Sequence, residues 1–232
     1  MSPASIIAYI LYILLPILTL YLGYLIVTKA FNDMGFSSIE AIIIVFLSFI
    51  LGAGILDGYI GISFANIHLF TYNNWLLGIN TGGAIVPIIL SIYLYVKNKL
   101  QMKKALLGIM IVAVITYIVT DVKPERGIVS SFPQFLIPAF TASLISIIFL
   151  WQDKRKAAPF AYICGTIGVL IGADVFHLYS LLNFELTSPR TAIIGGADIF
   201  DMIFITGILA VLVDGLLIYQ EKRKVETKKN DF

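Results

Sequence analysis

The chain has 232 residues, of which 59% are hydrophobic and only 13% are charged, and its mean hydropathy is +0.94. A soluble domain carries about 45–50% apolar and about 25% charged residues, so this composition excludes a water-soluble fold, a disordered chain and a nucleic-acid-binding protein. The net charge of +2 indicates no partner, and the single cysteine, Cys164, excludes an internal disulfide and a thiolate metal cluster. The apolar excess predicts a polytopic membrane protein whose partner is the lipid bilayer.

Uninterrupted apolar stretches predict about seven transmembrane helices, because a helix needs roughly 20 apolar residues to cross about 30 Å of hydrocarbon. In chain order the stretches are 5–28, 39–57, 83–97, 105–121, 134–151, 159–180 and 198–219. We therefore expect an all-α integral membrane protein built as a helical bundle. Residues 1–220 would form a single transmembrane domain, and residues 221–232 a charged cytoplasmic tail.

The Lys and Arg residues predict the orientation of the bundle, because basic residues in short loops stay on the cytoplasmic side. With seven spans, all but three of the 16 basic residues fall on the side of the C-terminal tail, and the exceptions are Lys123, Arg126 and Arg190. We therefore expect a multi-pass protein of the plasma membrane with its N-terminus outside and its C-terminus in the cytoplasm.

The stretch 58–82 contains neither Lys nor Arg and has no long helical period. Apolar side chains alternate between Ile60 and Phe64, and Asn73-Asn74 is typical of a turn. Two interpretations are open. The stretch is either a partly membrane-inserted hairpin of extended chain that walls an outer site, or an ordinary interfacial loop anchored by aromatic side chains.

Ionisable residues in the predicted spans are concentrated toward the outer side of the membrane. A carboxylate in hydrocarbon costs roughly a few to ten kcal/mol, so each must face protein or water. The outer group comprises Asp57, Asp174, His177, Asp198 and Asp201, with Arg190 in an outer loop. Asp214 lies roughly 20 Å deeper, and we expect it to have a structural role, paired with a tail lysine or water.

Small residues accompany these carboxylates. One side of the 159–180 helix carries Ala161, Gly165, Gly168 and Gly172 at helical spacing. This pattern predicts close packing against another helix and a central position in the bundle. The order Gly-Gly-Ala-Asp at 195–198 repeats Gly-Ala-Asp at 172–174, and glycines before a carboxylate leave room for chain, water or substrate. The candidate pocket residues are Asp57, His177, Arg190, Gly172 and Gly196.

The run IGGADIFDMIFITGILA at 194–210 occurs together with GTIGVLIGADVFHL at 165–178, NTGGAIVPIILS at 80–91 and the loop 124–138. These segments, spread over 50–215, resemble DUF1614, a family of bacterial and archaeal polytopic membrane proteins of unknown function. The resemblance implies kinship in fold and no particular reaction. It also implies that Asp174 and Asp201 match carboxylates of the family, whereas Asp198 stands where glycine is usual.

One functional hypothesis is an intramembrane hydrolase of the aspartyl type. Two carboxylates on adjacent helices that share one proton act as base and acid toward a water molecule. Asp174 and Asp201 would be the catalytic pair, with Asp198 as substitute or orienting group. The substrate would be a membrane protein or a peptide.

Two alternatives remain open. The first is a transporter that binds protons or a divalent metal ion, for which the candidate ligands are Asp57, Asp174, His177 and Asp201. The second is a non-catalytic membrane scaffold subunit whose carboxylates fix helix packing. Nucleotide chemistry has no support, because the sequence contains neither a P-loop nor a dinucleotide fingerprint.

Overall fold

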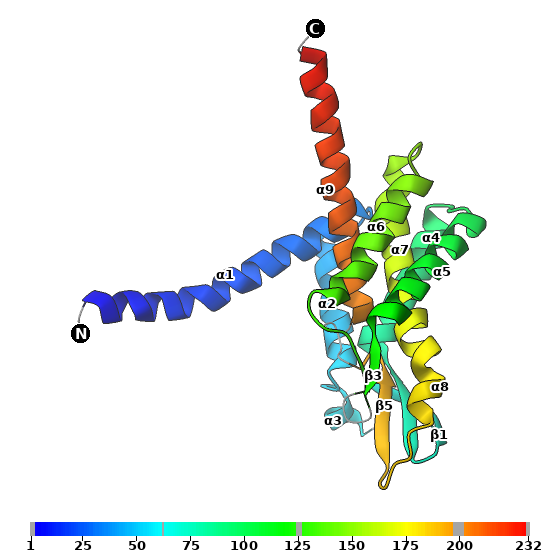
Figure 1. The fold of residues 1–232 in the computed structure, drawn as a ribbon. Coiled ribbons are helices and arrows are strands. Elements are labelled where there is room, and N and C mark those ends of the chain that lie inside the picture. The colour runs from blue at the N-terminus through cyan, green and yellow to red at the C-terminus, as the bar shows by residue number, and fades with distance from the viewer. Residues whose placement is uncertain (1–2, 62, 124–126, 197–201, 231–232) are drawn as a thin grey trace.

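The protein is a bundle of helices with a small sheet at one end (Figure 1). The computed structural model describes residues 3–61, 63–123, 127–196 and 202–230. We call the end of the bundle that carries the strands the sheet end. We call the opposite end, where the connections 98–101 and 150–156 lie and from which the C-terminal half of the last helix projects, the tail end.

The α-helices are α1 (Pro3–Asp33), α2 (Ser38–Gly52), α3 (Asp57–Ile60), α4 (Val86–Lys97), α5 (Met102–Val119), α6 (Ile137–Phe149), α7 (Ala157–Val169), α8 (Phe176–Leu182) and α9 (Met202–Asn230). Two π-helical segments, η1 (Thr81–Ile85) and η4 (Leu170–Val175), and two 3₁₀ segments, η2 (Gln134–Leu136) and η3 (Lys154–Lys156), adjoin them. The strands are β1 (Asn66–Tyr72), β2 (Trp75–Asn80), β3 (Asp121–Lys123), β4 (Gly127–Val129) and β5 (Arg190–Ile194).

Within the residues that the structure describes, three helical stretches are long and apolar enough to cross a membrane, namely Leu14–Asp33, Met102–Val119 and Lys154–Leu182. Shorter apolar helices cover Ser38–Gly52, Thr81–Lys97, Gln134–Phe149 and Met202–Leu217. The chain is therefore a multi-pass membrane protein. Each predicted span overlaps one of these stretches, whereas the count of seven crossings, their orientation and the division at residue 220 stay predictions.

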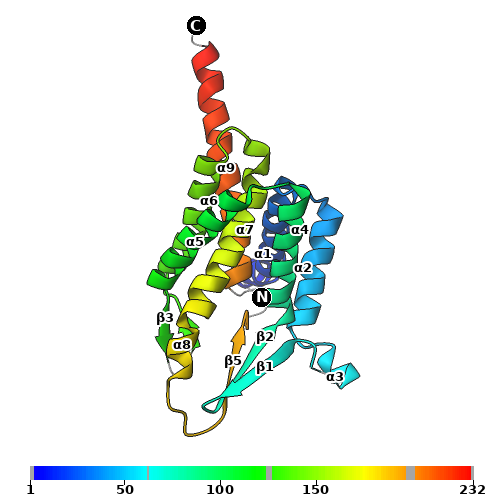
Figure 2. The same cartoon turned by 90° about the vertical axis from the view of Figure 1, so that its right-hand side faces the viewer.

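Helix α7 lies at the centre of the bundle, where it contacts α4, α5, α6 and α9 (Figure 2). Every residue of α7 except Ile167 is buried. The surrounding helices turn apolar side chains outward, among them Ile92 of α4, Leu107 of α5 and Leu144 of α6. Such a surface needs lipid as its solvent. The predicted central position of the 159–180 helix is confirmed.

The small residues of this central helix allow the close packing that the sequence predicts. A Cβ atom on Gly168 would lie 2.6 Å from Cβ of Val112 on α5, and one on Gly172 would lie 2.7 Å from Cβ of Thr116. Gly165 faces α9 instead. The row of small residues therefore serves two neighbouring helices, α5 and α9, and not one.

The predicted extended hairpin in 58–82 is confirmed as β1 and β2, which pair antiparallel from Asn66 opposite Asn80 to Tyr72 opposite Trp75. The turn residues Asn73 and Asn74 have φ of 45° and 64°. A two-residue hairpin turn of type I′ needs positive φ at both positions, and asparagine tolerates this better than most residues. Whether the hairpin enters the membrane stays a prediction.

The expectation of an all-α fold is wrong at the sheet end. Strand β5 adds to the hairpin in parallel, from Trp75 opposite Arg190 to Ile79 opposite Ile194, in the order β1-β2-β5 (Figure 2). A second pair, β3 and β4, follows α5. A parallel strand takes its conformation from a partner far away in the chain, so the local pattern of a short connecting segment does not predict it.

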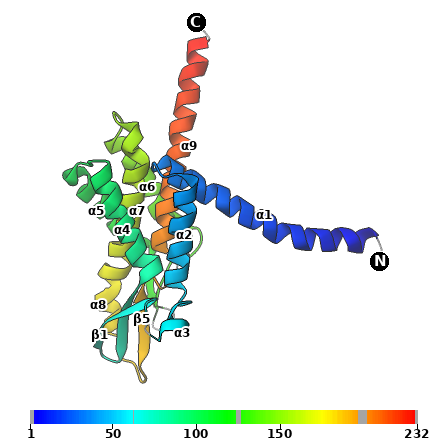
Figure 3. The same ribbon diagram turned by 180° about the vertical axis from the view of Figure 1, so that it is seen from behind.

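Helix α1 extends away from the rest of the bundle (Figures 1 and 3). It contacts α2 and α9 near its C-terminal end, and large apolar side chains such as Leu14, Leu18 and Ile26 are exposed along it. A helix that exposes so much apolar surface needs lipid or another protein surface to cover it. This helix therefore contributes to the bundle core only near its C-terminal end, where Ala30 and Phe31 are buried.

Gly172→Ala should destabilise the protein even though alanine favours helices. The added Cβ meets the backbone and Thr116 of α5, and such overpacking typically costs about 1–3 kcal/mol. We expect a lower apparent melting temperature in detergent, followed by tryptophan fluorescence. Gly23→Ala is the matched control, because a Cβ at Gly23 meets nothing within 4 Å. Equal melting temperatures for the two variants would show that α5 does not pack closely on α7.

Candidate functional site

A cavity of about 320 Å³ lies at the sheet end, between η4, the β4 segment and the beginning of α9. Its polar wall residues are Thr120, Ser130 and Asp174, and the others are apolar. We call it the sheet-end cavity. Of the predicted site residues that the structure describes, Asp174 is the one that lines it.

Asp174 reaches the sheet-end cavity from the π-helical segment η4. A π-helical turn interrupts the regular α-helical pattern, and such turns are frequent at functional sites. The side chain of Asp174 is half-buried. Gly172, two residues earlier, does not line the cavity, because its missing side chain accommodates Ala113 and Thr116 of α5.

His177 is buried beside the sheet-end cavity and faces the end of α5. Its Nε2 lies 2.9 Å from Oγ1 of Thr120 and 3.3 Å from the carbonyl oxygen of Tyr117, and its ring stacks on the Tyr117 ring at 4.4 Å. The carbonyl can only accept, so the contact with Tyr117 requires a hydrogen on Nε2. His177 therefore holds α8 against α5, and Thr120 connects it to the cavity wall.

Asp57 stands outside the second span and away from the sheet-end cavity. Helix α2 ends at Gly52, and Gly54 has φ of +69°, which turns the chain before Asp57 begins α3. Oδ1 of Asp57 accepts hydrogen bonds from the amide nitrogens of Phe64, at 2.7 Å, and Ala65, at 3.1 Å. Asp57 thus lies beyond the end of α2, and its carboxylate fixes the loop that leads into β1, whereas its part in a pocket stays a prediction.

Arg190 and Gly196 lie at the two ends of the β5 segment. Arg190 is exposed at the beginning of the strand, and its backbone nitrogen donates to the carbonyl oxygen of Asn74 at 2.9 Å. Gly196 is exposed in the turn after the strand, where Gly195 has φ of +68° and packs against Ala84. Neither lines the sheet-end cavity.

Asp198 and Asp201 lie outside the described residues. The next residue, Met202, lines the sheet-end cavity together with Asp174. Among the residues that the structure describes, Asp57, Asp174 and His177 do not form a group that could hold a metal ion. The carboxylate pair and the divalent metal site therefore stay predictions.

A second polar region, which sequence reasoning missed, lies inside the bundle. It comprises four fully buried hydroxyl residues on two contacting helices: Ser143 and Ser146 on α6, and Tyr162 and Thr166 on α7. We call them the interior hydroxyl group. Within the described part of the chain, the side-chain oxygen of Ser143 has no hydrogen-bond partner, and those of Tyr162 and Thr166 have none beyond each other. An unpaired buried hydroxyl costs about 1–3 kcal/mol, and a function or an unseen water molecule or ion commonly explains it.

Asp214 of α9 adjoins the interior hydroxyl group. Its side chain is 1% exposed, Oδ1 contacts the Ser146 hydroxyl, and Oδ2 has no hydrogen-bond partner among the described residues. The Ser146 oxygen also lies 2.8 Å from the carbonyl oxygen of Ser143. A hydroxyl has one hydrogen, so the Asp214 carboxyl oxygen and the Ser143 carbonyl oxygen compete for the hydrogen that Ser146 donates.

The predicted partner of Asp214 was a tail lysine or water, and the structure gives it Ser146 on α6. Asp33 of α1 lies on the other side, with its Oδ2 3.0 Å from where a Cβ on Gly215 would be. Asp33 pairs with Lys29, whose Nζ lies 2.7 Å from Oδ2 of Asp33. Asp214 is thus placed between a buried group of hydroxyls and a partly exposed ion pair.

A family model matches residues 58–213, and its description is "Protein of unknown function (DUF1614)". The chain belongs to the DUF1614 family. The match covers Asp174, the sheet-end cavity and the interior hydroxyl group, and it ends one residue before Asp214. Comparisons with curated proteins and with solved structures find no match. Membership of the DUF1614 family therefore establishes kinship and no activity, so a function has to be argued from the geometry of the chain.

Asp57→Ala should release the loop before β1 without affecting the rest of the bundle. The amides of Phe64 and Ala65 lose their acceptor, and each lost hydrogen bond to a charged group is worth about 1.5–3 kcal/mol. We expect these amides to exchange with deuterium at least about tenfold faster in detergent. Asp121→Ala, which removes an exposed carboxylate at the same end, is the control. Unchanged exchange at 63–66 in Asp57→Ala would refute this role.

Proposed function

We propose that this DUF1614 protein moves protons through the interior of its bundle, with Asp214 as the proton-binding group. The observation that carries the proposal is the position of Asp214, which is buried against Ser146 and whose Oδ2 has no hydrogen-bond partner among the described residues. Buried carboxylates inside membrane helices commonly mark proton relays, because the neutral form tolerates the interior and the charged form does not.

The interior hydroxyl group supports a path toward the centre of the membrane. Tyr162 and Thr166 are one turn apart on α7, and both face α9 at Gly207, where a Cβ would lie 2.8 Å from Cε2 of Tyr162. From Gly207 to Asp214 the axis of α9 advances about 10 Å. Hydroxyls donate and accept at the same atom, so they can pass a proton along when water joins them.

An apolar layer separates this path from the sheet-end cavity. Val169 and Ile203 are buried and pack together with Ala84 and Ala173, between the level of Thr166 and that of Asp174. Along α7 and η4, Asp174 lies about 12 Å beyond Thr166. Hydrophobic constrictions gate membrane pores by excluding water. In this proposal, the layer is the closed gate and Asp174 is the proton acceptor on its far side.

The sheet end is proposed to face outside and the tail end the cytoplasm, as the basic residues predict. Lys97 and Lys104 lie near one tail-end connection, and Lys154, Arg155 and Lys156 lie at the other. Asp33 and Lys29, with 25% and 64% of their side chains exposed, would exchange the proton of Asp214 with the cytoplasm.

Asp214→Asn should reduce proton movement by at least tenfold, because asparagine keeps the shape and cannot release a proton. The measurement is the pH change inside proteoliposomes that carry a pH-sensitive dye, after an outward potassium gradient sets the membrane potential. Val169→Ala should increase the proton flux several-fold, because it thins the apolar layer. Asp153→Asn, a partly exposed carboxylate at the tail end, is the control.

Two outcomes would contradict proton movement. If the wild-type protein gives no more flux than empty liposomes, the transport proposal fails. If Asp214→Asn lowers the melting temperature and leaves the flux at the wild-type level, Asp214 only stabilises packing. The second result would favour the scaffold hypothesis.

A second candidate function is the aspartyl-type hydrolase. The observation in its favour is the sheet-end cavity, which both Asp174 and Met202, the residue after Asp201, line. A cavity of about 320 Å³ falls in the size range of small-molecule sites and admits a short segment of substrate. Asp174 would act with Asp201, and Asp198 would replace or orient one of them.

Asp174→Asn and Asp201→Asn should each abolish cleavage of a membrane-embedded peptide in detergent micelles if the hydrolase is correct, because a dyad needs both carboxyl groups. Asp57→Asn should retain full cleavage, since Asp57 bonds its own loop. The readout is mass spectrometry of a library of apolar peptides. Absence of cleavage by the wild-type protein, or cleavage that survives Asp174→Asn, would exclude this candidate.

A further inference from the structure

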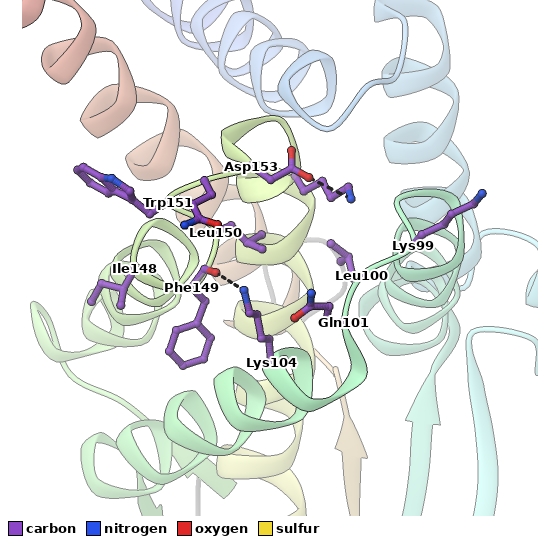
Figure 4. Close-up of a pocket in the computed structure, with 11 residues that line it drawn as sticks. Lys99, Leu100, Gln101, Lys104, Ile148, Phe149, Leu150, Trp151 and Asp153 are labelled. Atoms are coloured by element: carbon purple, nitrogen blue, oxygen red, sulfur yellow. Dashed lines mark hydrogen bonds and ion pairs between the residues drawn. The ribbon is translucent and has the colours of Figure 1, made fainter.

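A second cavity, of about 460 Å³, lies at the tail end of the bundle. The α4–α5 connection forms one wall of it, and the α6–α7 connection forms the other (Figure 4). We call it the tail-end pocket. Three ammonium groups, on Lys99, Lys104 and Lys156, line it against the single carboxylate of Asp153. Its charge therefore favours an anionic ligand.

Lys104 crosses the floor of the tail-end pocket. Its Nζ donates to the carbonyl oxygen of Phe149 at the C-terminal end of α6, at 2.7 Å (Figure 4). One contact uses one of the three N–H groups of the ammonium, and the side chain is half-buried. Lys156 pairs with Asp153 at 3.0 Å on the opposite wall, and Lys99 extends outward at the rim. The ammonium group of Lys104 is therefore held in place and has further N–H groups that can donate to a ligand.

The tail-end pocket adjoins an exposed apolar surface of α6. Phe140, Leu144 and Ile148 are exposed at every fourth position of α6 and form an apolar stripe that leads to it. Trp151, 56% exposed, stands beside the end of the stripe, and Lys154 lies 4.6 Å from the centre of its ring. Tryptophan is enriched at the depth of lipid headgroups. The pocket thus lies where headgroups meet the protein.

We propose that the tail-end pocket binds the phosphate of an anionic phospholipid, with an acyl chain along the Phe140–Ile148 stripe. Basic pockets between helices at a membrane surface recognise acidic headgroups in this way. The apolar stripe favours a lipid over a free phosphate, because a soluble anion would gain nothing from it. This site is independent of the proton path, which it does not touch.

The test compares lipid retention by native mass spectrometry of the purified protein in detergent. Phosphatidylglycerol and phosphatidylcholine with identical acyl chains are added at equal concentration. We expect the wild-type protein to retain the anionic lipid at least tenfold better. Lys99→Gln/Lys104→Gln should reduce this preference at least tenfold, because glutamine removes the positive charges and keeps an N–H donor at each position. Lys103→Gln, an exposed lysine outside the lining, should leave it within twofold.

Three results would overturn the proposal. Equal retention of both lipids by the wild-type protein would show that the tail-end pocket does not recognise an anionic headgroup. An equal loss in Lys103→Gln would mean that net charge alone attracts the lipid. Thermal stabilisation by glycerol phosphate as strong as that by phosphatidylglycerol would assign the pocket to a soluble phosphate. Melting curves of all variants are recorded first, and Lys99→Gln alone replaces the double variant if the latter fails to fold.

Discussion

The structure depends on one helix that is surrounded by protein inside a bundle whose outer surface needs lipid. Helix α7 buries every residue except Ile167, and lipid offers no hydrophobic force to pull other helices onto it. What holds the neighbours in place is close van der Waals packing, which glycines permit at α5 and α9. The π-helical segment η4, which brings Asp174 to the sheet-end cavity, and the buried hydroxyls of Tyr162 and Thr166 lie on this helix or its continuation. A substitution that widens the packing of α7 against α5 and α9 therefore alters these features together.

Much of the architecture could be predicted from the sequence, since lipid imposes strict rules on length and polarity. Apolar runs locate the helices, the spacing of Gly165, Gly168 and Gly172 identifies the central one, and Asn73-Asn74 locates the hairpin turn. Strand β5 could not be predicted in this way. Its hydrogen bonds go to β2, and only the assembled fold brings the two segments together.

The candidate site residues could likewise be predicted only in part from the sequence. The sequence predicts that Asp174 faces a polar space, because a carboxylate in a span must avoid lipid. It does not predict that Asp57 bonds its own loop or that His177 contacts Thr120, because helix ends and side-chain partners depend on local geometry. Serine and threonine in apolar helices usually bond their own backbone, so Ser143 and Thr166 carry no visible signal. Ser143 lies three residues before Ser146, and Thr166 lies four residues after Tyr162. This helical spacing is the one sequence feature that could have indicated these buried hydroxyl residues.

The parallel pairing of β2 with β5 has a consequence for biogenesis. About 110 residues separate the two strands, so the ribosome, at about 5–20 residues per second, completes the second strand several seconds after the first. During that interval one edge of the hairpin exposes unpaired backbone groups, which invite pairing with another nascent chain. The arrival of the late strand therefore closes a backbone edge that is open to wrong pairing until then.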